Sequence, residues 1–149
     1  MSNSTGGPYV QMALLCERVL QEKDNVLSVI RAIDRFTITA AGQNPPAEMP
    51  PGAINAMLVV TLKSGDMRGR FNIRVVPRSP SLKTMPEIAA GVLLEGGDRG
   101  VNFLAEVHMA VTEEGLYWFD VYLEDQLLTR IPMRVLYQRV AQGGLFQRQ

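Results

Sequence analysis

The chain has 149 residues, of which 15 are basic and 15 are acidic, so its formal net charge is zero. This length is enough for one sizeable hydrophobic core and short for two, which predicts a single domain. A balanced charge argues against nucleic-acid-binding and membrane-surface proteins, because both classes usually carry a basic excess. We therefore expect neither nucleic acid nor a membrane among its partners.

The single cysteine, Cys16, excludes an intrachain disulfide and every zinc site built from paired cysteines. Residues 1–8 are small and polar, so we expect them to be disordered. They also lack the basic and apolar regions of a signal peptide. No stretch approaches the roughly 20 apolar residues of a membrane helix. These features predict a cytoplasmic protein with one domain over residues 9–140 and a flexible tail over 141–149.

The segment from Val10 to Ile38 has two interpretations. Apolar residues recur at helical spacing from Val26 to Ile33, whereas the residues from Val10 to Cys16 alternate as in a strand. Residues 26–30 are also rich in β-branched side chains, and the polar residues 22–25 could turn one strand into the next. The pattern alone leaves a helix and a strand–turn–strand unit equally open.

The stretch from Gly42 to Gly52 contains four prolines and is predicted to be a loop, because proline removes a backbone donor from a helix or sheet. Residues 57–63 are expected to form a buried strand, Ser64 to Asp66 a turn, and residues 68–76 the hairpin partner of that strand. The inward side chains of the partner are expected to be Phe71, Ile73 and Val75.

A second loop, over residues 77–86, precedes a strand candidate at 88–95, a glycine-rich turn at 96–100 and a strand at 101–111. The expected inward residues of the last strand are Phe103, Ala105, Val107, Met109 and Val111.

The clearest pattern covers residues 115–123 and 127–137, where apolar residues alternate at period two on both sides of a polar turn at 124–126. The expected inward residues are Tyr117, Phe119, Val121 and Leu123 in the first half, and Leu127, Thr129, Ile131, Met133 and Val135 in the second. Many short strands without alternating helices predict an all-β fold, an antiparallel two-sheet β-sandwich of about seven or eight strands.

Glu113, Gly115, Tyr117 and Phe119 are spaced as at the start of strand F in immunoglobulin-like domains. In those domains the tyrosine hydroxyl bonds back to the backbone and forms a tyrosine corner. Phe119 stands where they have a cysteine, and Trp118 points to the opposite face from their core tryptophan. The resemblance implies an immunoglobulin-like sandwich topology, with structural roles for Tyr117 and Phe119.

The sequence also has characteristic apolar segments at residues 13–17, 26–35, 115–121 and 132–135. Together they resemble a family of small uncharacterised bacterial proteins known only as a domain of unknown function. The resemblance implies a β-sandwich whose first segment is a pair of strands, and it therefore favours strands for residues 10–38. It implies no activity and no site.

No constellation of catalytic side chains is evident. His108 is the single histidine, so any triad would need it, and the alternation places it outward beside Glu106. Cys16 lies among leucines and is interpreted as a buried apolar residue. Glu95 and Asp98 lack the spacing of a calcium loop, and their segment is interpreted as a plain turn. We therefore expect no enzyme activity, no metal site and no cofactor.

Two surfaces are candidate binding sites. Arg68, Arg70 and Arg74 share the outward face of one strand and could hold an anion, although a solvated face is the simpler interpretation.

The second surface is formed by Leu116, Trp118 and Tyr122 on the outward face of another strand. Large aromatic residues on the outer face of a sheet need cover. The cover would come from the N-terminal segment, from a long loop or from a binding partner. The sequence thus predicts a non-enzymatic module that binds a protein partner or forms a homo-oligomer, with anion binding as the alternative.

Overall fold

The computed structural model describes residues 6–141, which form seven β-strands and no helix. The strands are β1 (Tyr9–Gln21), β2 (Leu27–Ile33), β3 (Arg35–Gly42), β4 (Gly52–Arg78), β5 (Ile88–Val111), β6 (Gly115–Leu123) and β7 (Gln126–Ala141). The prediction of an all-β chain is confirmed, and the helical interpretation of residues 10–38 is wrong. No helix in the described range is long and apolar enough to span a membrane.

The two terminal segments predicted to be disordered or flexible lie largely outside the described residues, which exclude 1–5 and 142–149. Residues 6–8 of the N-terminal segment are described, and Gly6 is hydrogen-bonded to Asp66. The Gly6 carbonyl accepts from the backbone N–H of Asp66 at 2.7 Å, and the Gly6 N–H donates to the Asp66 carboxylate at 2.7 Å. The chain just before β1 is therefore held against the middle of β4.

Backbone hydrogen bonds join all seven strands into one sheet with the order β2-β1-β4-β6-β7-β3, and β5 pairs with β4. β3 pairs with β7 in parallel, whereas the other pairs are antiparallel. The sequence predicted two separate antiparallel sheets. This prediction is not confirmed, because hydrogen bonds join the strands into a single sheet that contains one parallel pair. The parallel pair arises at Asp34, where the chain passes from β2 directly into β3 and the Asp34 carbonyl accepts from the N–H of Arg134 at 3.0 Å.

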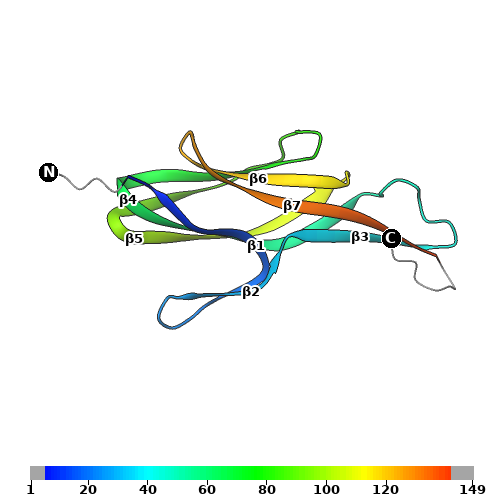
Figure 1. Ribbon diagram of the computed structural model, residues 1–149, viewed down its shortest axis with the longest axis horizontal. Helices are drawn as coiled ribbons and strands as arrows, with labels where there is room; N and C mark the ends of the chain where they lie inside the picture. The colour runs from blue at the N-terminus through cyan, green and yellow to red at the C-terminus, as the bar shows by residue number, and fades with distance from the viewer. Residues whose placement is uncertain (1–5, 142–149) are drawn as a thin grey trace.

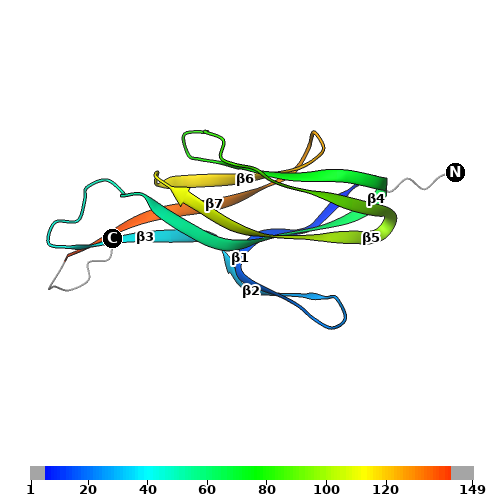
Figure 2. The same ribbon diagram turned by 180° about the vertical axis from the view of Figure 1, so that it is seen from behind.

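β4 and β5 are long strands that stay paired while both bend. Their ladder shifts between Lys63 and Arg68, and Gly65 lies opposite Gly97 at the bend. At the left end of Figure 1 the sheet folds over, so the two halves of β4 and β5 lie in two layers, as Figure 2 also shows from behind. The half of β4 before the bend pairs with β1, and the half after it pairs with β6.

The predicted hairpin between residues 57–63 and 68–76 is therefore wrong. Both segments belong to β4, and each pairs with β5. The glycines that indicated turns do change the chain direction, since Gly65 and Gly97 have φ of 61° and 64°. Glycine adopts such left-handed conformations without a steric penalty. The turn signals therefore mark a bend that two neighbouring strands share.

The hydrophobic core lies between the two layers and draws residues from β1, β4, β5, β6 and β7 into one cluster. Most of the residues expected to point inward are buried there: Ile73, Val75, Phe103, Val107, Met109, Val111, Tyr117, Phe119, Val121, Leu123, Ile131, Met133 and Val135. Residues from both layers pack together, because side chains alternate along each strand and only one set faces the opposite layer.

Leu127 is an exception to the predicted inward set, since it is 46% exposed. The ladder between β6 and β7 shifts at this point, with Val121 opposite Thr129 and Tyr122 opposite Leu127. The extra residue, Leu128, packs against the core instead. A one-residue shift exchanges the two faces of a strand, so the bulge places Leu127 on the outer face.

Candidate functional site

The layer that contains β6 and the second half of β4 carries, on its outer face, a group of polar and aromatic side chains that contact one another. It is built where β6 lies between the second half of β4 and the first half of β7. We call this group the arginine–aromatic face; it consists of Arg74, Arg78, Trp118, Asp120, Tyr122 and Arg130. Three strands separated in the sequence thus contribute to one surface.

Asp120 is the centre of this face. It is only 4% exposed, and each of its carboxylate oxygens accepts one hydrogen bond. Arg78 Nε donates to Oδ2 at 2.7 Å, and Arg130 Nε donates to Oδ1 at 2.7 Å. A buried carboxylate is costly unless it is paired and hydrogen-bonded. The two arginines therefore make it possible to bury Asp120 on the outer side of the sheet.

Two arginines of this face, Arg74 and Arg130, also cover the aromatic rings. The guanidinium of Arg130 lies 4.4 Å from the ring centroid of Trp118, and that of Arg74 lies 4.9 Å from the ring centroid of Tyr122. Both distances suit cation–π attraction. Arg78 also donates from Nη2 to the Tyr122 hydroxyl at 3.3 Å. Its hydrogen bonds, first to Asp120 and then to Tyr122, raise the pKa of Arg78.

Leu116, Trp118 and Tyr122 are all half-buried on the outer face of β6. Cover was expected from the N-terminal segment, from a long loop or from a partner. Among the described residues, arginines of the neighbouring strands cover the two aromatic rings. Leu116 lies opposite Arg134 of β7.

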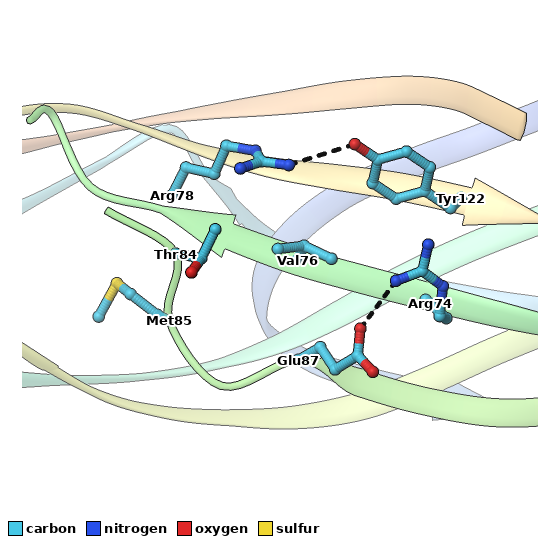
Figure 3. A pocket seen from close by; sticks show the side chains of 7 residues that line it. All are labelled: Arg74, Val76, Arg78, Thr84, Met85, Glu87 and Tyr122. Atoms are coloured by element: carbon cyan, nitrogen blue, oxygen red, sulfur yellow. Dashed lines mark hydrogen bonds and ion pairs between the residues drawn. The ribbon is translucent and has the colours of Figure 1, made fainter. Parts of the chain in front are cut away.

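A cleft of about 420 Å³ lies beside Tyr122, between the sheet and the loop from β4 to β5. Figure 3 shows Arg78 reaching toward Tyr122 and Arg74 reaching toward Glu87, with Val76 between the two arginines. Arg74 Nη1 donates to Glu87 Oε2 at 2.9 Å. The remaining lining residues are Thr84 and Met85. Both arginines of the cleft therefore already have carboxylate partners.

The three arginines predicted to hold an anion are not brought together. Arg74 lies in this cleft, Arg70 borders a separate hollow with Gly91 and Leu93, and the guanidinium of exposed Arg68 lies beside Gly96.

Arg78, Asp120 and Arg130 were not among the site residues predicted from the sequence. Alternation does place Asp120 on the same face as Trp118 and Tyr122. Only the pairing of β6 with β4 and β7, which period-two patterns do not specify, places both arginines beside it.

Tyr117 and Phe119 lie on the inner face of β6 and are 1% and 0% exposed. The Tyr117 hydroxyl donates to the Glu113 carbonyl at 2.9 Å and accepts from the Glu113 N–H at 3.3 Å. This is the backbone contact that a tyrosine corner makes. Burial raises the pKa of Tyr117. The contact fastens the segment before β6 to the core.

His108 and Cys16 are not brought together. His108 is exposed on β5, where its ring contacts Asn55 and its Nε2 lies 3.2 Å from Glu106 Oε2. Cys16 is fully buried on β1, its Sγ donates to the Arg18 carbonyl at 3.4 Å, and burial raises the pKa of its thiol. β4 lies between these two strands in the sheet.

The glycine-rich bend of β5 shows an ion pair. Arg99 Nη1 lies 2.9 Å from Glu95 Oε2. Across residues 6–141, no group of three or more histidine, cysteine or acidic side chains is arranged to hold a metal ion.

Comparison with curated proteins finds no match. Among solved structures, the chain is similar to an immunoglobulin-like protein from Pseudomonas aeruginosa, with 12% identity and a TM-score of 0.41. The alignment covers 89% of this chain and 99% of that one. A family of unknown function (DUF6941) matches residues 11–136. The match spans most of the sequence, and the chain therefore belongs to this family.

Proposed function

We propose that the chain is a non-enzymatic binding module that associates through the arginine–aromatic face, either with a second copy of itself or with a protein partner. The arrangement of Trp118 and Tyr122 carries this proposal. Both rings are half-buried, and arginines anchored to the buried carboxylate of Asp120 or to Glu87 hold them in place. Tryptophan, tyrosine and arginine dominate the binding energy of many protein interfaces.

The fixed geometry of this face supports binding. Association costs free energy for every side chain that loses freedom on binding. Here Arg78 and Arg130 are already ordered by Asp120, so less of that cost remains. Leu127 extends the face with apolar surface, since it is 46% exposed and lies opposite Tyr122. Aromatic, arginine and apolar side chains thus lie together on one face, and aromatic residues and arginine are enriched at protein interfaces.

The charges of the face favour a partner with acidic groups or free carbonyl oxygens. Arg74, Arg78 and Arg130 contribute three positive charges, whereas Asp120 contributes one negative charge and Glu87, next to the face, a second. The side chain of Arg130 is 41% exposed and so remains accessible above Trp118. Its guanidinium has donors beyond the Nε that binds Asp120, and these are available to an incoming acceptor.

Anion binding is the second candidate, and the cleft in Figure 3 favours it because two arginines line it. An anion would have to replace Glu87 as the partner of Arg74. Glu87→Gln should then strengthen the binding of inorganic phosphate, measured by calorimetry, whereas Arg74→Gln should abolish it. Equal phosphate affinity in the two variants would contradict this role.

We also propose that the folded sheet is an immunoglobulin-like sandwich with β3 as an added parallel strand, and that the protein is cytoplasmic. The antiparallel ladders of the other strands and the single core cluster support the first point. The single buried thiol, Cys16, agrees with a reducing compartment.

The experiment that tests the binding module uses Trp118, the single tryptophan, as its own reporter. We expect light scattering to show an assembly of the wild type, and dilution to shift the Trp118 emission to the red. Trp118→Ala should give a folded monomer, whereas Tyr9→Ala, which removes an exposed aromatic residue from β1, should assemble normally.

The face could instead bind a different protein, which is the second occupant that we propose. A wild type that is monomeric should then capture a specific protein from the source cell, and Trp118→Ala should not. A wild type that stays monomeric at about 100 μM and captures the same proteins as Trp118→Ala would overturn the proposal.

A further inference from the structure

A second cleft lies on the outer side of the layer that contains β1 and the first half of β4. It is far along β4 from the arginine–aromatic face. The hairpin of β1 and β2 folds back beneath this layer, as its blue ribbon shows in Figure 1. Its tip residues Asn25, Val26 and Leu27 border the same cleft as Thr61 and Lys63 of β4. The cleft has a volume of about 550 Å³, which is within the usual range for small-molecule sites.

The wall on the sheet side is polar. The ladder of β1 and β4 shifts between Val10 and Met12, and the bulge lets both Gln11 and Met12 border the cleft. Thr61 lies opposite Met12 on one side and opposite Asn102 of β5 on the other. Lys63 follows two positions later on the same face of the strand. Amide, hydroxyl and ammonium groups are thus gathered in one place.

Thr61 supplies an independent sign of a ligand. It is only 5% exposed, and its Oγ1 is the buried side-chain polar atom that lacks a hydrogen-bond partner within residues 6–141. Buried polar groups are almost always paired, because an unpaired one loses its bonds to water without replacement. Thr61 is one of the residues that line the cleft, so a ligand bound there would supply the missing partner.

The charge of the cleft specifies the kind of ligand. Lys63 is the single charged residue of the lining, and none of the ion pairs found among the described residues includes it. The acidic residues of the hairpin tip, Asp24 and Glu22, do not line the cleft and accept hydrogen bonds from the hairpin itself. Asp24 accepts from the N–H of Val26 at 3.1 Å, and Glu22 accepts from the hydroxyl of Ser28 at 2.8 Å. A single negative charge would therefore be balanced here.

On the hairpin side, Val26 and Leu27 supply apolar surface beside Asn25. Val26 is 59% exposed at the mouth of the cleft, and Leu27 follows it. An exposed valine beside an open cleft gains free energy when an apolar group covers it. The ligand should therefore combine one anionic group with an apolar body.

We propose that this cleft binds a small monocarboxylate with an apolar body. The carboxylate pairs with Lys63 and accepts hydrogen bonds from Thr61 and Asn102. The apolar body lies against Val26 and Leu27, so the tip of the hairpin closes over it.

The test uses 4-fluorobenzoate and 4-fluorophenylacetate as probes, observed by fluorine NMR with the full chain. We expect at least one probe to bind with a dissociation constant of about 1 mM or tighter, and neutral 4-fluorobenzamide not to bind. Lys63→Met should weaken binding by about tenfold, the usual effect of losing a charge-assisted hydrogen bond. Lys83→Met, which removes an exposed lysine from the loop between β4 and β5, should leave the affinity unchanged.

Thr61→Val separates the ligand contact from any role in folding. The variant should bind the probe several-fold more weakly while its melting temperature stays the same or rises, because the hydroxyl that it removes has no partner. The proposal is overturned if neither carboxylate binds, if the amide binds as well as the acid, or if Lys63→Met and Lys83→Met bind alike.

Discussion

Gly65 of β4 and Gly97 of β5 lie opposite each other at the point where the two strands bend together. Both have positive φ, at 61° and 64°. A bend in one strand alone would break the ladder, whereas a paired bend lets hydrogen bonding continue on both sides of it. This pair of glycines therefore places the second halves of β4 and β5 opposite the first, with the core between them.

Two glycines of β5, Gly91 before the bend and Gly100 after it, should respond differently to alanine substitution. A methyl group at Gly100 would overlap the carbonyl oxygen of Leu62, whereas a methyl group at Gly91 would meet open space. We expect Gly100→Ala to lower the free energy of unfolding by about 1–3 kcal/mol. Gly91→Ala should be neutral or stabilising by about 0.5 kcal/mol. Urea denaturation of both variants checks this, and equal stability of the two would contradict it.

Tyr117→Phe should remove the hydrogen bonds to Glu113 and leave the ring in the core. We expect a loss of about 1 kcal/mol, the usual net value of one hydrogen bond in a protein. Tyr9→Phe serves as the matched control, because Tyr9 is 48% exposed and its substitution should leave the melting temperature unchanged. An unchanged melting temperature for Tyr117→Phe would show that the corner does not stabilise the fold.

Asp120 and Arg130 should be energetically coupled. Asp120→Asn and Arg130→Met should each destabilise the protein, and the double variant should lose less than the sum of the two. We expect a coupling energy of about 1 kcal/mol. That is below the value for a fully buried pair because the side chain of Arg130 is 41% exposed. Additive effects in the double-mutant cycle would mean that the 2.7 Å contact adds no stability.

Stability should decline at high pH. Burial raises the pKa of Cys16 and Tyr117 above their ordinary values of 9.0 and 10.0, so the folded chain keeps these protons when the unfolded chain has lost them. The free energy of unfolding should therefore be unaffected by these groups below about pH 8 and fall as the pH rises above about 9.

Cys16→Ala isolates one contribution to this decline. The variant should be less stable at neutral pH because of the cavity, yet its stability should fall less steeply above about pH 9. Denaturation curves at several pH values give the two slopes. A steeper decline in the variant would contradict the assigned effect of burial.

The period-two patterns in the sequence predicted strands and their inward faces well, because alternation depends only on neighbouring residues. Tyr117 and Phe119 are examples of inward residues found in the core. Strand partners could not be predicted in the same way. The segments before and after Gly65 looked like two strands of a hairpin, since a glycine-containing turn and a glycine-containing bend share one sequence signal.

The candidate sites depend on such long-range pairing and were therefore predicted only in part. Trp118 and Tyr122 were recognised as an outer aromatic pair, but the arginines that cover them come from β4 and β7. Leu127 was misplaced because a bulge leaves no distinct signal in an alternating sequence. The cleft at Thr61 was not found, because it depends on a hairpin folding back over a distant strand.

The parallel pairing of β3 with β7 joins residues 35–42 to residues 134–141. During synthesis β3 leaves the ribosome about 100 residues before its partner exists, at a typical rate of about 5–20 residues per second. For those seconds its backbone groups lack the ladder that later satisfies them, and it can pair with other exposed strands. Completion of the sheet therefore waits for the last strand, and nascent chains halted before β7 should be more prone to aggregate than finished ones.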